Sequence, residues 1–351
     1  MIRYRIFVVI SILFSSVLNA QNSNNLETII NHANDSIPSL GAFLIWKNDK
    51  IIFEEYFNGA NANTNFKVKS VTKSVVSALA GIANDRHLLP QLNTLIFDLF
   101  PEYATDFTKN EEIGFPELIK SNDSLKRIIN LHDMLTMQTG YLWDDNSALS
   151  SRVFNSSSDP VRSTLDLPFE DFPGAIFKYC TPASHVVAAV IAKSIKANLK
   201  TFADTALFKP IGVNIDFWSC DPLGRTMGGT ELSMKATDML KFGLLYLNEG
   251  QANGKQIISK AWIQESTCEQ VELNNWEVLP QANGYGYYWW RREVKGHQAI
   301  VASGYGGQLI CVIPDLQLVI VTTCFVNENN RGRSEIKRIH GFIDEIVEVS
   351  K

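Results

Sequence analysis

Strand patterns occur at both ends of this chain and are nearly missing from its middle. The patterns cover residues 42–46 and 51–56 near the start, and 285–290, 308–313 and 316–324 near the end. Residues 47–50 supply the first turn, and Pro314 with Asp315 supplies the last. A sheet must bury its apolar face against another layer. This distribution therefore predicts one mixed sheet built from both ends of the chain, with a helical lobe inserted between its parts.

Helical patterns fill the middle of the chain and flank the strands. They cover residues 26–33, 74–83, 125–137, 184–195 and 335–349, the last as an amphipathic helix. We therefore predict an α/β lobe made of residues 21–85 and 225–351, and a mostly helical lobe made of residues 86–224. A cleft between two such lobes is the natural place for a functional site.

The first twenty residues have the layout of a secretory signal peptide. Arg3 and Arg5 give a positive start, residues 7–18 are apolar, and Ala20 ends a small-residue cleavage site. The apolar stretch is too short to span a bilayer comfortably, so an uncleaved anchor is the less favoured alternative. We expect an exported protein, periplasmic or extracellular, whose mature domain covers residues 21–351 and makes no stable membrane insertion.

The charge and motif content exclude several classes of function. The net charge is −5, so the chain lacks the basic field of a nucleic-acid-binding protein. The five cysteines contain no C-x-x-C pair and the six histidines lack metal-ligand spacing; no P-loop or G-x-G-x-x-G motif is present. We expect no metal, no cofactor and no nucleic-acid partner. We expect His132 and His185 to be satisfied core or surface histidines rather than ligands, and Cys311 and Cys324 to be buried as small hydrophobes.

The tetrad from Ser70 to Lys73, S-V-T-K, carries the chemistry that remains. Residues at i and i+3 share one face of a helix, so the lysine nitrogen can reach the serine hydroxyl. A lysine that is removed from water can lose its proton and serve as the base for that serine. A second S-x-x-K at residues 334–337 lies on the polar side of the final helix and is interpreted as chance. Ser70, by contrast, precedes an apolar helix that directs Lys73 toward the interior.

Several segments around and after this tetrad follow one another in a recognisable order. They are residues 66–74 and 77–83, 131–140 with Trp143, 177–181, 228–234 and 238–243, and 304–308 running into 312–315. Jointly they resemble the serine β-lactamase and penicillin-binding-protein superfamily, most closely its class C-like, esterase and 6-aminohexanoate-dimer-hydrolase branch. The resemblance spans roughly residues 41–324. It implies the β-lactamase/transpeptidase-like fold, an α/β (α+β) arrangement. This fold is a mixed antiparallel sheet flanked by N- and C-terminal helices, with an inserted, mostly helical lobe.

The resemblance also implies roles for individual residues. Ser70 would be the acylated nucleophile, Lys73 its base or proton relay, and Tyr179, in the position of the Y-x-N tyrosine, a second base whose phenol the neighbouring ammonium acidifies. The backbone N–H groups of Ser70 and Tyr305 would form the oxyanion hole. Whether Lys73 or Tyr179 takes the first proton stays open, and a core tyrosine is the alternative for Tyr179. The implied substrate-binding residues are Thr181, Ser303, Gly304, Gly306 and Trp143.

Two departures from the family pattern bear on the substrate. Thr181 stands where Y-x-N has asparagine, and Ala302-Ser303-Gly304 replaces Lys-Thr-Gly. The missing lysine removes the usual grip on a substrate carboxylate, unless Arg225 or Lys295 supplies the charge. We therefore expect an ester or amide hydrolase acting on a small molecule or short peptide. A β-lactamase or D-alanyl-D-alanine carboxypeptidase is the first alternative, and a non-catalytic binding or sensor module is the second. The oligomeric state stays open.

Two further groups have alternative interpretations. The aromatic residues can line an acyl pocket or pack in the core; they are Trp143, Tyr287, Tyr288, Trp289 and Trp290. Asp144 and Asp145 are interpreted as loop capping groups rather than catalytic acids.

Overall fold

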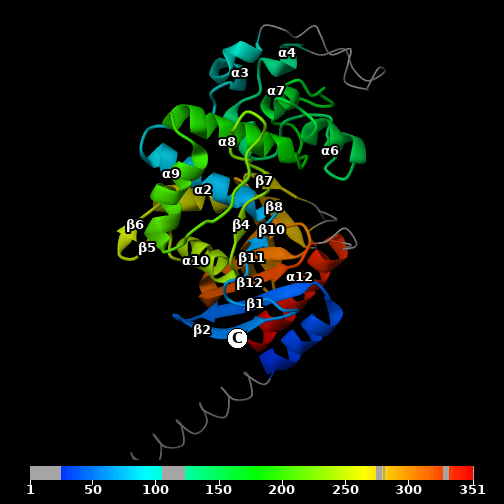
Figure 1. The fold of residues 1–351 in the computed structure, drawn as a ribbon, viewed down its shortest axis with the longest axis vertical. Coiled ribbons are helices and arrows are strands. Elements are labelled where there is room, and N and C mark those ends of the chain that lie inside the picture. The colour runs from blue at the N-terminus through cyan, green and yellow to red at the C-terminus, as the bar shows by residue number, and fades with distance from the viewer. Residues whose placement is uncertain (1–24, 105–122, 274–278, 280, 327–331, 351) are drawn as a thin grey trace, which may run out of the picture.

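A computed structural model describes residues 25–104, 123–273, 279, 281–326 and 332–350 (Figure 1). The signal peptide predicted for residues 1–20 lies outside these residues. Figure 1 shows a sheet with its helices at one end of the molecule and a group of helices, α3 to α8, at the other. Both ends of the described chain contribute to the sheet end.

The main sheet has eight strands in the order β2-β1-β12-β11-β10-β9-β8-β7. Their bounds are β1 Leu40–Lys47, β2 Lys50–Tyr56, β7 Val271–Glu272, β8 Ala282–Tyr285, β9 Trp290–Val294, β10 His297–Gly304, β11 Gln308–Ile313 and β12 Leu318–Cys324. Every pairing is antiparallel, and β1 from the start of the chain pairs with β12 from its end. This confirms the prediction that both ends share one sheet.

The first hairpin forms where the sequence predicts it. Asn48 and Asp49 both have positive φ, 47° and 65°, in the two-residue turn between β1 and β2. Asparagine and aspartate tolerate this conformation better than other residues with a side chain, and such a turn matches the twist of the strands it joins. Strand β11 also coincides with the predicted range, and β12 starts two residues later than predicted.

The strand predicted at residues 285–290 is wrong. Residues 286–289 instead turn the chain between β8 and β9. A side chain at Gly286 would lie 2.2 Å from the Ser266 carbonyl oxygen, and Tyr288 has a φ of 61°. The aromatic residues at this turn are buried, so the apolar run reflects burial of a turn rather than a strand. The prediction also missed β10, which follows this hairpin.

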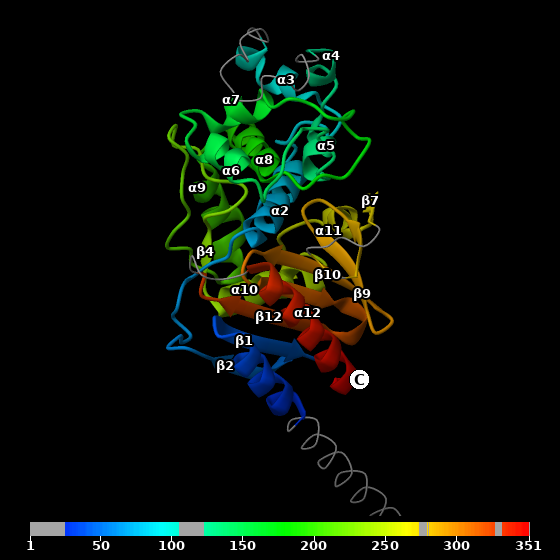
Figure 2. The same cartoon turned by 90° about the vertical axis from the view of Figure 1, so that its right-hand side faces the viewer.

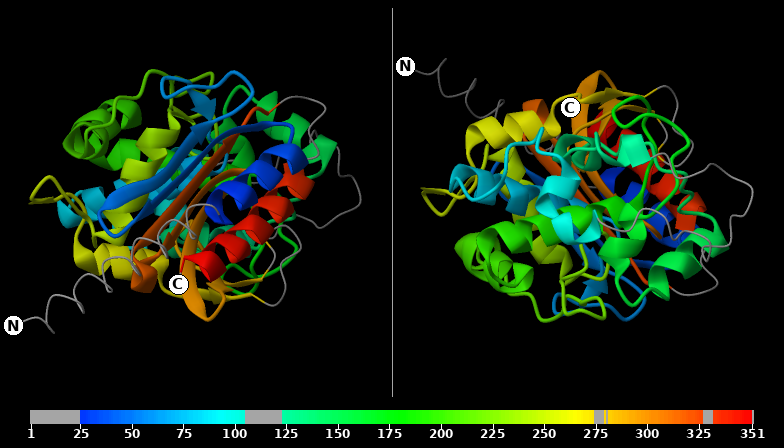
Figure 3. Two further views of the ribbon diagram at one scale, coloured as in Figure 1. Left: turned by 90° about the horizontal axis from the view of Figure 1, so that it is seen from below. Right: turned by 90° about the horizontal axis from the view of Figure 1, so that it is seen from above.

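Helices cover both faces of the sheet. On one face α12 (Gly332–Val349) lies beside the helix at residues 25–36, and the rings of His32 and Phe342 meet edge to face at 5.3 Å (Figure 3). On the opposite face lie α2 (Val71–Asp85) and α10 (Ala236–Leu247), as Figure 2 shows. None of the described helices is long and apolar enough to cross a membrane.

The remaining helices are mostly short. They are α3 Ile96–Leu99, α4 Asp123–Lys126, α5 Leu131–Leu135, α6 Ala148–Asn155, α7 Pro160–Leu165, α8 Thr181–Ile195, α9 Leu199–Ala203 and α11 Lys260–Thr267. Single turns of other helix types are η1 Pro101–Tyr103, η3 Asp204–Phe208, η4 Lys209–Ile211 and η5 Pro314–Leu316, and two-residue strands are β3 Phe66–Lys67, β4 Ser233–Met234, β5 Gln251–Ala252 and β6 Lys255–Gln256.

The single helix predicted at residues 125–137 is also wrong, because the chain breaks between α4 and α5. Ile129 accepts a backbone hydrogen bond from Ile96 at 3.0 Å, which pulls this segment into an extended contact. Asn130 and Asp133 then form a capping box that starts α5. The five cysteines are free, and Cys311 and Cys324 are buried as predicted.

Candidate active site

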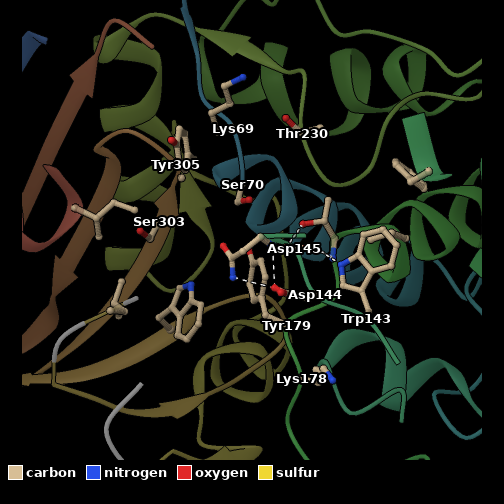
Figure 4. Close-up of a pocket in the computed structure, with 18 of the residues that line it drawn as sticks. Lys69, Ser70, Trp143, Asp144, Asp145, Lys178, Tyr179, Thr230, Ser303 and Tyr305 are labelled. Atoms are coloured by element: carbon tan, nitrogen blue, oxygen red, sulfur yellow. Dashed lines mark hydrogen bonds between the residues drawn. The ribbon is translucent and has the colours of Figure 1, made fainter. Parts of the chain in front are cut away.

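A cavity of about 1150 Å³ lies between the start of α2, the end of β10 and the loops before α6 and α8. Figure 4 shows Ser70 with Tyr305 and Ser303 on one side of it and Asp145 and Trp143 on the other. Most of the predicted site residues line this cavity: Ser70, Trp143, Tyr179, Thr181, Ser303, Gly304 and Tyr305. Lys73 lies buried behind Ser70, and Gly306 is not among the described residues that line the cavity.

Ser70 is held at the N-terminal end of α2. The chain reaches it from β3, which pairs with β4, and Val68 donates a backbone hydrogen bond to Leu232 at 2.9 Å. Lys69 then adopts a left-handed conformation with a φ of 51°, which turns the chain sharply into the helix. Ser70 occupies the cap position of a helix of 15 residues. Its backbone therefore lies at the positive end of a long helix dipole.

Lys73 follows one helical turn later and points back at the serine. Its Nζ lies 2.8 Å from Ser70 Oγ and donates a hydrogen bond to the Gly229 carbonyl oxygen at 2.9 Å. The residue is only 1% exposed. Burial lowers the pKa of Lys73 to about 8, while the negative charge of Asp145 opposes that shift. A minority of the molecules therefore carries a neutral amine at pH 7, and the neutral form predominates only above about pH 8.

The Gly229 carbonyl can reach Lys73 because Gly228 and Gly229 pack directly against α8. A side chain at Gly229 would lie 2.7 Å from the Thr181 side chain, and one at Gly228 would lie 2.2 Å from the Ser184 carbonyl oxygen. Any other residue would push this segment away from α8 and from Lys73.

Tyr179 completes the group around Ser70. Its ring centroid lies 4.9 Å from Lys73 Nζ, and the ring stacks on Trp290 with centroids 5.5 Å apart. Burial raises the pKa of the Tyr179 phenol, and the charge of Asp145 raises it further, while a hydrogen bond with Ser70 acts in the opposite direction. The net direction is upward. This direction differs from the expected acidified phenol, because loss of solvent is the largest cause of the shift and the Lys73 ammonium is not among its causes.

Asp145 is a site residue that the sequence interpretation missed. One carboxylate oxygen accepts hydrogen bonds from the backbone N–H of Thr181 at 3.1 Å and from the Trp143 indole; the other accepts from the Thr181 hydroxyl at 2.6 Å. Asp145 thus caps α8 from a distant loop, as a capping group would, but it also acts electrostatically on Lys73. No spacing signal links it to Thr181, because the pair is 36 residues apart.

Gly304 brings the end of β10 against the chain that precedes Ser70. A side chain there would lie 2.4 Å from the Val68 carbonyl oxygen and 3.2 Å from Cβ of Lys69. This close approach places the backbone of Tyr305 beside the start of α2. Tyr305 is 47% exposed and lines the cavity.

The aromatic residues divide between the two roles left open by the sequence. Trp143 and Trp290 line the cavity. Tyr287, Tyr288 and Trp289 are buried in packing contacts, and the Tyr288 hydroxyl donates to the Met134 carbonyl. The sequence interpretation did not single out Phe154, Leu279 and Ile336, which add to the apolar wall.

Neither cation that was considered as a replacement for the missing lysine lies at the site. Arg225 pairs with Asp221 at 2.6 Å and Lys295 pairs with Glu348 at 3.3 Å, both away from the cavity. The lysines that line the cavity are instead Lys69 and Lys178.

Comparison with known proteins gives one family and many related folds. The family model described as Beta-lactamase matches residues 26–341, whereas no curated protein matches the sequence. The solved structure of EstCE1, a hydrolase with promiscuous acyltransferase activity, has a TM-score of 0.73 at 14% identity, over 95% of this chain and 99% of that one.

Two further structures give the same fold. A penicillin-binding protein homologue from Caulobacter crescentus has a TM-score of 0.66 at 13% identity, over 92% of this chain and 97% of that one. A protein from Bacillus anthracis, provisionally named 6-aminohexanoate-dimer hydrolase, has a TM-score of 0.68 at 18% identity, over 91% and 81%. These likenesses confirm the predicted β-lactamase/transpeptidase-like fold.

Proposed function

The chain belongs to the Beta-lactamase family of serine hydrolases, and from this premise we propose that it cleaves an ester or amide bond through an acyl-enzyme on Ser70. The observation that carries the proposal is the 2.8 Å hydrogen bond between Ser70 Oγ and the buried amine of Lys73. A desolvated lysine beside a hydroxyl is an arrangement that activates a nucleophile. Covalent labelling of Ser70 by a fluorophosphonate tests the proposal.

Acylation begins with transfer of the Ser70 proton to Lys73. Lys73 is the first base because burial lowers its pKa to about 8, whereas burial raises that of Tyr179. As the proton leaves, Oγ bonds to the substrate carbonyl carbon and the electron pair of the C=O bond moves to the oxygen. The backbone N–H groups of Ser70 and Tyr305 bind this oxyanion. The close approach of Gly304 to the chain before Ser70 supports this pairing of donors.

Breakdown of the tetrahedral intermediate needs a proton for the leaving group. Tyr179, which hydrogen-bonds to Ser70, supplies it, and the Lys73 ammonium, whose nitrogen lies 4.9 Å from the centroid of the Tyr179 ring, returns a proton to the phenol. A phenol with a raised pKa stays protonated and is suited to donate. A water molecule then attacks the acyl carbon, its proton follows the same route in reverse, and the acid product leaves as Ser70 regains its hydrogen.

The charges around the cavity favour an ester or amide over a carboxylate-bearing β-lactam or D-alanyl peptide. Ala302 stands in the place of the lysine that grips such carboxylates. Among the described residues that line the cavity, Lys178 pairs with Glu170, and Lys69 lies 3.9 Å from Glu231. The substrate is a small molecule or short peptide, in keeping with the size and the apolar walls of the cavity. Faster turnover of a chromogenic cephalosporin than of simple esters would contradict this preference for esters and amides over β-lactams.

The pH dependence of the reaction follows from Lys73. Only its neutral form accepts the Ser70 proton, so kcat/KM is expected to rise with pH and to level off above about 8. Asp145 raises the pKa of Lys73, so Asp145→Asn is expected to move this rise to lower pH. The asparagine keeps the contacts to Thr181, because its oxygen can accept from the backbone and its amide can donate to the hydroxyl.

Asp144→Asn is the matched control for the pH experiment. Asp144 also lines the cavity, but it is not among the charges that shift the pKa of Lys73. The pH–rate profile of this variant is expected to rise at the wild-type position. An Asp145→Asn profile that rises at the wild-type pH, or at higher pH, would contradict Lys73 as the first base.

We further propose that the enzyme acts outside the cytoplasm after loss of residues 1–20. The basic start, the apolar segment at 7–18 and the small residue Ala20 support this. The intact mass of protein recovered from the periplasm or the medium is expected to equal that of residues 21–351. An exported protein that retains its first twenty residues would argue for an uncleaved anchor instead.

A further inference from the structure

His185 is a buried histidine of α8 with a defined partner on each ring nitrogen. Its side chain is 0% exposed. Nε2 lies 3.0 Å from an Asp221 carboxylate oxygen, and Nδ1 lies 3.3 Å from the backbone nitrogen of Gly228. The sequence predicts a core or surface histidine here, and the burial agrees with a core position. The two polar contacts of the ring suggest a second role besides packing.

These partners determine which nitrogen carries the hydrogen. The Gly228 N–H can only donate, so Nδ1 must be the unprotonated acceptor, and Nε2–H then donates to Asp221. Asp221 holds this tautomer in place because it is itself fixed. It accepts from the backbone N–H groups of Leu223 and Arg225 at 2.9 Å each and from the Arg225 guanidinium at 2.6 Å.

The peptide that His185 holds leads directly to the base. Gly228 is followed by Gly229, whose carbonyl oxygen is the acceptor for Lys73 Nζ at 2.9 Å. Two consecutive glycines have wide backbone freedom, so their position depends on their close packing against α8 and on hydrogen bonds such as this one. The hydrogen bond to Gly228 fixes the segment on one side, and the Trp218 indole fixes it on the other by donating to the Met227 carbonyl at 2.7 Å.

We propose that His185 is a positioning residue for catalysis: through Gly228 it holds the Gly229 carbonyl where it orients Lys73 toward Ser70. The inference rests on the proposed role of Lys73 as base. His185 is not among the residues that line the cavity, so its loss affects the chemical step rather than substrate binding. His185 acts on Lys73 through Gly228 and Gly229. The Gly228 N–H donates to His185, and the Gly229 carbonyl accepts from Lys73.

Three substitutions of His185 test the contacts of its two ring nitrogens separately. His185→Asn places an amide oxygen near the position of Nδ1 and keeps the acceptor for Gly228. His185→Gln reaches the position of Nε2 and keeps the donor to Asp221. His185→Phe loses both contacts but keeps a ring that packs on Phe154, whose centroid lies 6.0 Å away. Ester turnover is measured for each variant, normalised to the fraction of active sites titrated by a fluorophosphonate and counted by intact mass.

The expected pattern distinguishes positioning from a structural role. The Gln and Phe variants are expected to lose about 10- to 100-fold in kcat, as for a displacement of a catalytic group by a fraction of an ångström to one ångström, with KM within about twofold. The Asn variant is expected to recover most of kcat although it lacks the contact to Asp221. Thermal stability is expected to fall in all three variants, so a loss of stability does not explain the order of their kcat values.

His340→Asn is the matched control. His340 is 1% exposed, and its Nδ1 contacts Arg292, which lies on β9. This variant is expected to lose stability and keep kcat.

Each failure points to one proposal. A wild type that is folded but neither hydrolyses esters nor forms an adduct would contradict the proposed function. An active wild type whose Phe variant keeps its kcat, or whose Asn variant loses as much as the Gln variant, would contradict the role of His185. If the Phe variant does not fold, the comparison of the Asn and Gln variants decides alone.

Discussion

Ser70→Ala is expected to abolish turnover and to remove every covalent adduct with a fluorophosphonate. Ser70 Oγ lies 2.8 Å from Lys73 Nζ at the start of α2, which makes it the hydroxyl that this amine can activate. Loss of the nucleophile in serine hydrolases costs on the order of 10⁶-fold in kcat, and what remains comes from binding and the oxyanion hole. We expect a loss of at least about 10⁴-fold, measured with an activated ester, together with an unmodified intact mass.

The substitution itself is mild for the fold. Ser70 caps α2 without a side-chain hydrogen bond to the helix, so alanine removes little that holds the helix start. The melting temperature is therefore expected to stay near that of the wild type. Ser163→Ala is a matched control, because Ser163 is also half-buried and its hydroxyl donates to a local carbonyl, that of Pro160. The Ser163→Ala variant is expected to be labelled fully by the fluorophosphonate. Labelling or turnover that survives in Ser70→Ala would place the nucleophile elsewhere. A folded wild type without an adduct would favour the binding-module alternative.

Lys73→Met is expected to remove activity while leaving the protein at least as stable as the wild type at pH 7. Methionine has a similar length and tolerates burial, but it offers no base for Ser70. General bases contribute about 10²- to 10⁴-fold, and we expect kcat/KM to fall by about 10³-fold or more. The losses of kcat/KM caused by Ser70→Ala and Lys73→Met are expected to be non-additive in the double variant, because each substitution disables the same proton transfer.

The stability of this variant follows from the direction of the pKa shift. The pKa of Lys73 falls from 10.5 to about 8 on folding, so the unfolded chain binds this proton more tightly. The folded wild type therefore carries its full penalty below pH 8 and loses it as the pH rises toward 10.5. At pH 7 the shift corresponds to a penalty of on the order of 3 kcal/mol, which methionine does not incur. Chemical denaturation at pH 7 and pH 10 measures the difference, which is expected to shrink at the higher pH.

Lys126→Met provides the matched control. Lys126 is also 1% exposed, but it lies 3.4 Å from Asp166 in the helical part and away from the cavity. Its replacement breaks a buried ion pair and is expected to lower stability by a few kcal/mol while kcat stays unchanged. If Lys73→Met were less stable than the wild type at pH 7, or kept its activity, the proposed role of Lys73 as a buried catalytic base would be contradicted.

Local patterns were sufficient to predict those parts of the molecule that depend on neighbours in the chain. The turn at Asn48 and Asp49 and the pairing of Ser70 with Lys73 at i and i+3 are of this kind. The aromatic run from Tyr287 to Trp290 was misread because burial alone makes a turn look like a strand. Residues that act across long separations gave no signal.

Two of these long-range residues matter most at the site. Asp145 meets Thr181 over 36 residues, and His185 meets Gly228 over 43 residues. Both looked like ordinary loop or core residues in the sequence, because a hydrogen bond between distant segments leaves no periodic trace. The direction of the Tyr179 pKa was likewise beyond the sequence, since it depends on how much water the folded site excludes.

The pairing of β1 with β12 has a consequence for the order in which the enzyme is built. Leu40 pairs with Cys324, so the edge of β1 that faces away from β2 stays unpaired until β12, far along the chain, has been made. Joining segments this far apart carries a large loop-closure cost and slows folding. A growing chain can form α2 with Ser70 and Lys73 on one face, but it cannot complete the sheet that supports β10 and the backbone of Tyr305. The arrangement proposed for catalysis therefore forms only after β12 has been made, and a shorter chain holds Ser70 and Lys73 without the completed sheet.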